Sequence, residues 1–267
     1  MRKFFSCSVT SLALIALVFI GYLGVQTWLE ARPGSSIINR PTVGVAGYTL
    51  PDFTGTIGNS GYDISWPQCR VQISDRLVNF VIIGLNHGKP LTTNPCFESQ
   101  WQWARKHDAA AIYINTSDPA TMSPTARGKQ IASDTLSRLR DAAVAKDVPI
   151  WLDVETHNTW TDSDRSVTML NTLIQVLHDA GHPVGIYSTP VEWFTITMGA
   201  QVTVPTWLAI GKYSTVARGV AGAKAACEGI GFGDPRPAIV QFVAKVDGLW
   251  LDRNIMCTQP NGLVARP

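Results

Sequence analysis

The chain has 267 residues and a mass of 29.0 kDa, which is enough for one large domain or two small ones. Hydrophobic residues make up 45% of it and charged residues 16%, a composition that excludes a disordered, collagen-like or coiled-coil protein. The formal net charge is +2 and there is no block of Lys and Arg, so we expect no nucleic-acid partner.

The N-terminus has the pattern of an export signal. Met1-Arg2-Lys3 precedes an uncharged, mostly apolar stretch over residues 4–29. At about 1.5 Å per residue, a helix of this length can span a hydrocarbon core of roughly 30 Å, and the basic residues favour an N-terminus inside the cell. We predict a signal anchor over residues 1–30, with a cleaved signal peptide as the alternative. The remainder is then extracytoplasmic, either held at the membrane by this N-terminal helix or secreted.

The rest of the chain divides into a linker and one folded domain. Residues 31–56 are rich in Pro, Gly, Ser and Thr and lack periodicity, which predicts a linker; residues 57–267 form the predicted domain. Apolar runs there alternate with amphipathic segments. The predicted strands cover residues 61–64, 80–84, 110–115, 184–187, 207–210 and 238–243, with one more beginning at residue 149, and the predicted helices cover residues 97–107, 123–146 and 164–180.

Alternation of strands and helices at this spacing predicts an α/β fold with parallel strands. About 200 residues is small for a (β/α)8 barrel, so we expect an irregular TIM-like barrel in which some helices are short or missing. A doubly wound open sheet is the alternative. That fold favours a glycine-rich turn after the first strand, which residues 61–65 do not provide.

The cysteines agree with export. Four follow the N-terminal segment, and they allow three pairings. Two loops of similar length favour sequential pairing, Cys69 with Cys96 and Cys227 with Cys257. A zinc site is disfavoured because the chain has no C-x-x-C motif and no paired His spacing. We therefore predict two disulfides, no metal and no cofactor.

Two acidic residues mark the strand that begins at residue 149. Asp153 and Glu155 occupy alternate positions, so their side chains point to the same side, toward the barrel axis or its rim, while Val154 faces the helices. Carboxylates close together repel and burial raises a carboxyl pKa, so one partner can keep its proton near neutral pH. Barrel enzymes place catalytic groups at this end of their strands.

Two further acids occupy similar positions. Asp63 ends the first predicted strand, and Asp252 follows the last apolar one. A single acid at a strand end is most often a helix cap or an ion-pair partner, but four carboxyls from three strand ends favour a shared site. Calcium or magnesium ligation is the alternative, and the chain has no EF-hand-like loop to support it. We expect the four carboxyls to converge on one groove, with Glu155 the least solvated.

Several motifs in order resemble those of one family, the family 25 glycoside hydrolases or Chalaropsis-type lysozymes. The similarity spans residues 61–256. The motifs are Gly61-Tyr62-Asp63-Ile64-Ser65, Phe80-Val81-Ile82-Ile83, Pro149-Ile150-Trp151-Leu152-Asp153-Val154-Glu155, Gly185-Ile186-Tyr187-Ser188, Trp193, Pro205-Thr206-Trp207-Leu208-Ala209, Val240-Gln241-Phe242 and Asp252-Arg253-Asn254.

The resemblance implies an irregular barrel that hydrolyses β-1,4 bonds between N-acetylmuramic acid and N-acetylglucosamine, with peptidoglycan or a related glycan as its partner. Glu155 then corresponds to the general acid/base, and Asp153 to the group that orients a 2-acetamido nucleophile. Asp63 and Asp252 would hold the polar network and help to set the pKa of Glu155. Substrate assistance would make this an exception to the two-carboxylate retaining scheme.

Other residues are candidates for substrate binding. Tyr187, Trp207 and Gln241 match family positions near the sugar, Tyr113 keeps a family Tyr, and Trp66 follows Asp63 and could form an apolar platform. The histidines at positions 87 and 157 are interpreted as solvent-facing loop residues rather than members of a proton network.

The sequence departs from the family pattern at two strands. Residues 84–88 replace a K-A-T/S-E-G-like run. Where the third strand of the family usually has Y-H-F, this chain has Tyr113-Ile114-Asn115, which keeps the Tyr and loses the His. These changes motivate two alternatives to a lysozyme. One is a weak or inactive glycan-binding module on the same barrel, and the other is a hydrolase of another surface polysaccharide.

Overall fold

The computed structural model describes residues 40–45, 58–73, 78–233 and 235–257. The chain divides into a unit of residues 1–39, outside the described residues, and a unit of residues 40–267. The predicted N-terminal anchor lies outside the described residues. Among the residues that are described, none of the helices has the length and apolar character that a membrane span requires.

Helices and strands alternate along most of the chain, as predicted. The strands are β1 (Thr42–Val43), β2 (Ser60–Ile64), β3 (Phe80–Gly84), β4 (Ala109–Asn115), β5 (Ile150–Asp153), β6 (Val184–Ser188), β7 (Gln201–Val202), β8 (Thr206–Lys212), β9 (Ile239–Val246) and β10 (Leu249–Met256). The helices are α2 (Phe97–Ala104), α3 (Pro124–Asp141), α4 (Ser163–Asp179), α5 (Pro190–Thr197) and α6 (Val216–Cys227), with a 3-10 turn η1 (Trp66–Gln68).

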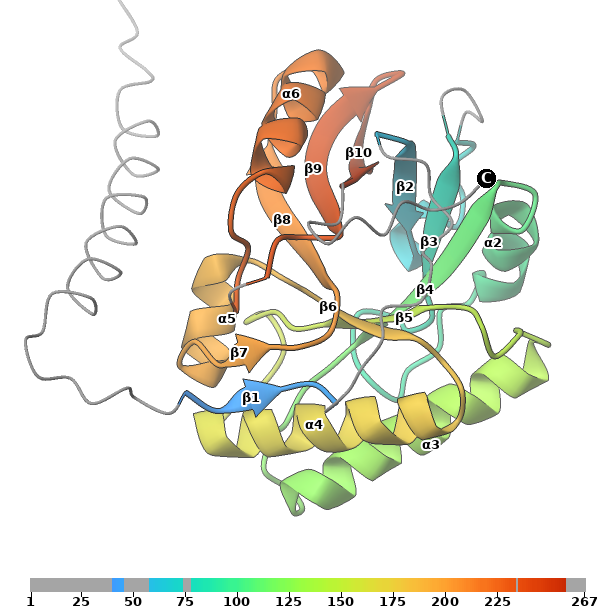
Figure 1. Cartoon of the computed structure of the whole chain (residues 1–267). Coiled ribbons are helices and arrows are strands. Elements are labelled where there is room, and N and C mark those ends of the chain that lie inside the picture. The colour runs from blue at the N-terminus through green and yellow to red at the C-terminus, as the bar shows by residue number, and fades with distance from the viewer. Residues whose placement is uncertain (1–39, 46–57, 74–77, 234, 258–267) are drawn as a thin grey trace, which may run out of the picture. The chain divides into compact units, whose positions relative to one another are not determined.

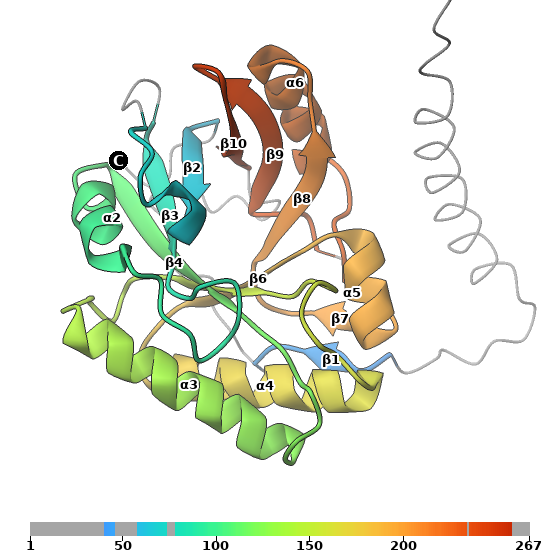
Figure 2. The ribbon, with the colours of Figure 1, turned by 180° about the vertical axis from the view of Figure 1, so that it is seen from behind.

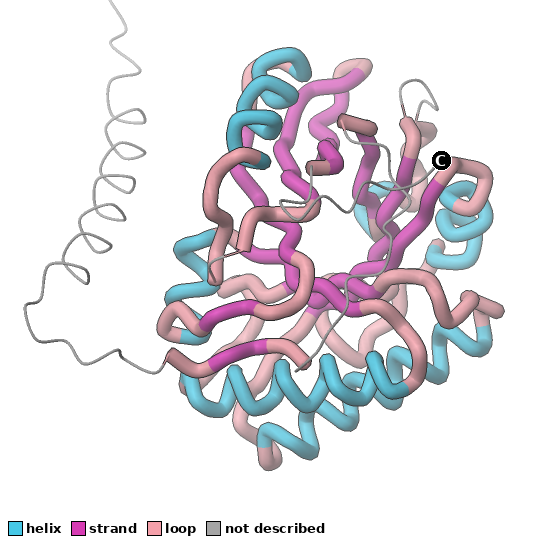
Figure 3. The backbone as a smooth tube through the Cα atoms, in the orientation of Figure 1, coloured by secondary structure: helices cyan, strands magenta, loops and turns pink. Residues whose placement is uncertain are grey.

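Eight strands close into a barrel in the order β10-β2-β3-β4-β5-β6-β8-β9 (Figure 1). The ring of strands lies inside and the helices lie around it (Figure 3), so the predicted irregular α/β barrel is confirmed. From behind, α3 and α4 lie side by side along one flank (Figure 2).

The last strand differs from the expectation of parallel strands. β10 runs antiparallel to both β9 and β2. β9 and β10 form a hairpin whose two turn residues, Asp247 and Gly248, both have positive φ. Asp-Gly is the preferred pair for such a turn, because its twist matches that of the flanking strands. The hairpin aligns Asp252 with Asp63 across the closing seam of the barrel.

Successive side chains of a barrel strand point alternately into the barrel interior and into the layer between the barrel and the helices. Both sides of the strand are therefore buried, which explains why its sequence is a continuous apolar run. On β3, Val81 and Ile83 belong to the layer between barrel and helices, whereas Phe80 and Ile82 fill the barrel interior. On β5, Leu152 faces the helix layer and Trp151 the interior. Asp153, two residues after Trp151, therefore points into the barrel, and the outward orientation predicted for Val154 is confirmed.

Part of the predicted linker belongs to the barrel domain. β1 pairs in parallel with β7. Asn171 of α4 also bonds to this segment, accepting from the Gly44 N–H and donating to the Thr42 carbonyl. The low-complexity composition of residues 31–56 hid this short strand because two residues carry no periodicity.

Both predicted disulfides are present. Cys69 pairs with Cys96, and Cys227 pairs with Cys257, with Cα atoms 5.5 and 5.3 Å apart. The first joins η1 to the start of α2, and the second joins the end of α6 to the chain just after β10.

Removing the second disulfide should weaken the domain. We expect replacement of both Cys227 and Cys257 with Ser to lower the free energy of unfolding by about 3 kcal/mol, because the bridge closes a loop of 30 residues that is otherwise free in the unfolded chain. Urea unfolding of the oxidised wild type and the double variant measures this. Equal midpoints would show that the bridge adds no stability.

Candidate active site

A cavity of about 530 Å³ opens at the carboxyl ends of the parallel strands, a volume typical of small-ligand sites. All four acids predicted to be catalytic line it: Asp63, Asp153, Glu155 and Asp252. The remaining lining residues are Ile64, Ser65, Trp66, Pro67, Gln68, His87, Gly88, Lys89, Tyr113, Asn115 and His157. We call this cavity the acidic groove.

Asp63 is buried on β2 and is held by amide donors. Gln241 donates Nε2 to both of its carboxylate oxygens at 3.1 Å, and Asn254 donates Nδ2 at 2.7 Å. Burial raises the pKa of Asp63 well above its ordinary value, and the neighbouring Asp252 raises it further, against the two amides. Two acids directly opposite on antiparallel strands repel. Burial raises the pKa of Asp252 to about 6.

Asp153 is buried at the end of β5 beside the end of β4. Asn115 is its register partner and donates Nδ2 to Asp153 Oδ2. The other oxygen, Oδ1, is buried and has no hydrogen-bond partner among the described residues. Burial raises the pKa of Asp153 well above its ordinary value, and the charges of Glu155 and Glu192 add to this. Asn115, the last residue of the altered third-strand motif, thus contacts this acid directly.

Glu155 lies in the loop after β5, because the strand ends at Asp153 rather than continuing as predicted. Its side chain is 22% exposed, so it is more solvated than the buried Asp63 and Asp153, and the expectation that it is the least solvated acid is wrong. A loop position explains the difference, since water reaches the rim but not the barrel interior. Burial still raises the pKa of Glu155, and Glu192 raises it further, while His157 and Tyr187 oppose the rise.

His157 is a member of the site that the sequence interpretation missed. Its Nδ1 lies 2.8 Å from Glu155 Oε2, although the side chain is 51% exposed. The interpretation as a solvent-facing residue was therefore right about exposure and wrong about partners. The D-x-E-x-H spacing was a usable signal, because three alternate residues can point to one side of an extended segment.

Asp153, Glu155 and His157 are also the residues that could hold a metal ion. Each offers a ligand atom, and these atoms lie within 4.8 Å of one another. Two of the three already contact each other, and one carboxylate oxygen of Asp153 is bonded to Asn115. A cation here would therefore displace contacts within the acidic groove.

The five predicted substrate-binding residues fall into two groups. Trp66 and Tyr113 line the acidic groove. Trp66 is 40% exposed, and its ring packs against that of His87, with the ring centroids 4.1 Å apart. Gly84 makes room for Tyr113, since a Cβ at residue 84 would lie 2.6 Å from the tyrosine ring.

The other three, Tyr187, Trp207 and Gln241, do not line the groove and instead build its support. The Tyr187 hydroxyl donates to Gln241 Oε1 at 2.9 Å, and Gln241 in turn donates to Asp63. Trp207 is 2% exposed and donates its indole N–H to Asn254 Oδ1 at 2.8 Å. A buried indole cannot stack on a sugar, so Trp207 acts by orienting the amide that bonds Asp63.

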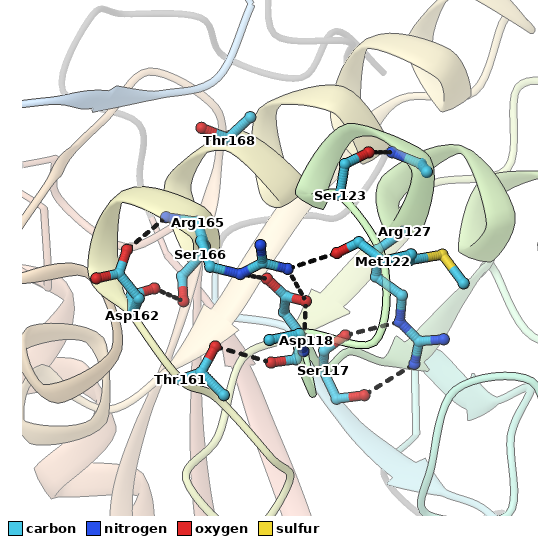
Figure 4. A network of polar contacts seen from close by, with 12 residues as sticks. Ser117, Asp118, Met122, Ser123, Arg127, Thr161, Asp162, Arg165, Ser166 and Thr168 are labelled. Atoms are coloured by element: carbon cyan, nitrogen blue, oxygen red, sulfur yellow. Dashed lines mark hydrogen bonds and ion pairs between the residues drawn. The ribbon is translucent and has the colours of Figure 1, made fainter.

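A second polar network fixes the loops that carry the groove residues (Figure 4). Arg165 of α4 donates Nε and Nη2 to the two carboxylate oxygens of Asp118 at 3.1 Å, and Nη2 also donates to the Met122 carbonyl. The Asp118 N–H donates to the Thr159 carbonyl at 2.9 Å, which ties the loop after β4 to the loop after β5. Glu155 and His157 lie in that second loop.

The raised carboxyl pKa values predict a pH dependence of stability. A carboxyl whose pKa is higher in the folded state holds a proton that the unfolded chain releases, so the free energy of unfolding falls as the pH rises through that window. For Asp252 the window runs from 3.8 to about 6, and Asp63, Asp153 and Glu155 add in the same direction. We expect a higher melting temperature at pH 5 than at pH 7.

Replacing Asp252 with Asn removes the titration while keeping the shape. At pH 4 the variant and the wild type should differ little for this reason. At pH 7 the free energy of unfolding of the variant should exceed that of the wild type by on the order of 1 kcal/mol, since one pKa unit corresponds to about 1.4 kcal/mol before solvent screening. Asp247→Asn, at an exposed turn residue whose positive φ suits both side chains, is the matched control. A wild type equally stable at pH 5 and pH 7 would contradict the burial of these acids.

The comparisons with known proteins agree with this geometry. The sequence profile of a family described as "Lysozyme-like protein 1" matches residues 94–221. No curated protein matches the chain in sequence.

Solved structures share the fold. A family 25 glycosyl hydrolase from Bacillus anthracis aligns with a TM-score of 0.55 and 16% identity over 85% of this chain and 96% of that one. The catalytic domain of endolysin ply40 from bacteriophage P40 of Listeria monocytogenes aligns at 0.54 and 15%, over 79% and 100% of the two chains. The Clostridium perfringens spore cortex lytic enzyme SleM aligns at 0.54 and 15%, over 81% and 71%. The chain therefore has the fold of the family 25 glycosyl hydrolases and, over residues 94–221, the sequence pattern of a lysozyme-like family, which confirms the resemblance seen in its motifs.

Proposed function

We propose that this protein is a cell-wall glycoside hydrolase that cleaves the β-1,4 bond between N-acetylmuramic acid and N-acetylglucosamine in peptidoglycan. The observation that carries the proposal is the acidic groove, where Asp63, Asp153, Glu155 and Asp252 line one cavity of sugar size. Similarity to a lysozyme-like family, to an endolysin and to a spore cortex lytic enzyme supports the choice of substrate.

Glu155 is the proposed general acid. Its pKa is raised, so it retains a proton closer to neutral pH than an ordinary Glu, and its partial exposure at the rim lets it reach a bound glycan. It would donate this proton to the glycosidic oxygen as the bond from that oxygen to C1 of the sugar breaks. Asp153 has a raised pKa too, but it is buried and bonded to Asn115, which fits a role in positioning.

Asp153 is proposed to orient the 2-acetamido group. Its Oδ1 has no partner among the described residues and could accept the acetamido N–H. The acetamido carbonyl oxygen would then form a bond to C1 as the leaving oxygen departs. In the second half of the reaction, water would attack C1 as the bond from C1 to the acetamido oxygen breaks, and it would give a proton to the Glu155 carboxylate. Asp63 and Asp252 would hold the polar network beside the reacting sugar.

Trp66 and Tyr113 are the proposed sugar contacts, because both line the groove. The two disulfides and an extracytoplasmic substrate support action outside the cytoplasm. We keep the N-terminal signal anchor, or cleaved signal peptide, as part of this proposal; it lies outside the described residues.

Incubation of the purified protein with peptidoglycan tests the proposal. We expect new reducing ends to appear over time. Binding of muropeptides without any release of reducing ends over long incubation would instead support the glycan-binding module that the altered second and third strands suggest. Cleavage of other surface polysaccharides, but not of peptidoglycan, would support the third alternative.

A further inference from the structure

A fifth carboxyl group, that of Glu192, lies near the acidic groove on the helix that follows β6. Glu192 lies in the first turn of α5 and does not line the groove. Its Oε1 accepts from both the backbone N–H and the hydroxyl of Thr156, at 3.2 and 3.1 Å. Its Oε2 accepts from the Thr189 hydroxyl at 3.0 Å. Thr156 is the residue directly after Glu155.

These contacts hold the Glu192 side chain in one place. The backbone N–H and the hydroxyl of Thr156 donate to one carboxylate oxygen and the Thr189 hydroxyl donates to the other. The side chain lies in the first turn of α5. Glu192 is thus bonded directly to the residue that follows the proposed acid.

The charge of Glu192 acts on both groove acids of the β5 segment. After burial, it is the largest contribution that raises the pKa of Glu155, and it also raises that of Asp153. The other titratable groups that act on Glu155 are Asp63, Asp153, Asp252, Tyr187 and His157. His157, which is half exposed, lowers the pKa of Glu155 and so acts against Glu192.

We propose that Glu192 is a positioning residue for Glu155: through its hydrogen bonds to Thr156 it fixes the loop that carries Glu155, and it places a second carboxyl group next to that loop. This rests on the proposed function of Glu155 as the acid. Glu192 and His157 then have opposite effects on the pKa of Glu155. The pH range in which Glu155 can act as an acid therefore depends on residues other than the four groove carboxyls.

Glu192→Gln separates charge from position, because the amide oxygen can still accept from Thr156. In the full-length protein we expect the alkaline limb of the kcat profile against pH to move down by about 0.5 to 1 pH unit, with KM little changed. Thr156→Val removes one hydrogen bond but no charge, so its alkaline limb should stay in place. Glu98→Gln, an exposed acid on α2, controls for the loss of one negative charge elsewhere.

A direct titration distinguishes failure of this inference from failure of the proposed function. The carboxyl carbon of Glu155 in protein labelled with 13C-Glu, assigned by its loss in Glu155→Gln, reports the proton without any need for turnover. A midpoint that moves to lower pH in Glu192→Gln, but not in Glu98→Gln, supports the inference even if no glycan is cleaved. An unchanged midpoint, with the fold intact by circular dichroism, overturns it.

Discussion

Glu155→Gln should reduce turnover of peptidoglycan by about 10²- to 10⁴-fold, the range that general acid catalysis contributes. Gln keeps the size of the side chain and its place beside His157 but has no proton to donate to the leaving oxygen. The initial rate of reducing-end release at saturating substrate measures the loss, and KM should change little because the groove keeps its shape.

The matched control is Glu98→Gln, which makes the same chemical change at an exposed helix position outside the acidic groove. It should retain wild-type turnover. If Glu155→Gln releases reducing ends as fast as Glu98→Gln does, Glu155 is not the acid.

Arg165→Ala should cost about 3 kcal/mol of stability, the lower end of the range for breaking a buried ion pair. Asp118 is 1% exposed at its side chain and Arg165 is 28% exposed. Without the guanidinium, Asp118 keeps the Ala120 N–H at 3.1 Å, so most of a buried negative charge is left uncompensated. Urea unfolding of wild type and variant gives the difference.

Two comparisons make this result specific. Arg236→Ala breaks an ion pair whose side chains are 43% and 68% exposed, and it should change stability by less than about 1 kcal/mol. The double variant Asp118→Asn with Arg165→Met removes both charges and should be more stable than Arg165→Ala alone. A loss in Arg165→Ala no larger than that in Arg236→Ala would show that the Asp118 pair does not hold the two loops.

Sequence periodicity predicted the barrel and its acids well because both depend on local alternation. Asp153 follows Trp151 by two residues, so the same rule that buries the indole in the barrel points the carboxylate inward. The β9–β10 hairpin was missed, although Asp247-Gly248 between two apolar runs is a strong turn signal.

The partners of these acids could not be predicted, since they are set by tertiary register. Asn254 reaches Asp63 from a strand 191 positions away, and Glu192 reaches Thr156 from a helix that periodicity did not indicate. Aromatic residues on strands gave no signal that separates groove from core: Tyr113 lines the groove, and Trp207 lies beneath it.

The central claim is that the acidic groove cleaves the bond on the reducing side of N-acetylmuramic acid. Peptidoglycan digested by the wild-type protein, reduced with borohydride and hydrolysed, reveals by mass spectrometry which sugar became the new reducing end. We predict the alditol of muramic acid, accumulating with time and absent after digestion with Glu155→Gln. The alditol of glucosamine instead, or no new alditol, would contradict the claim.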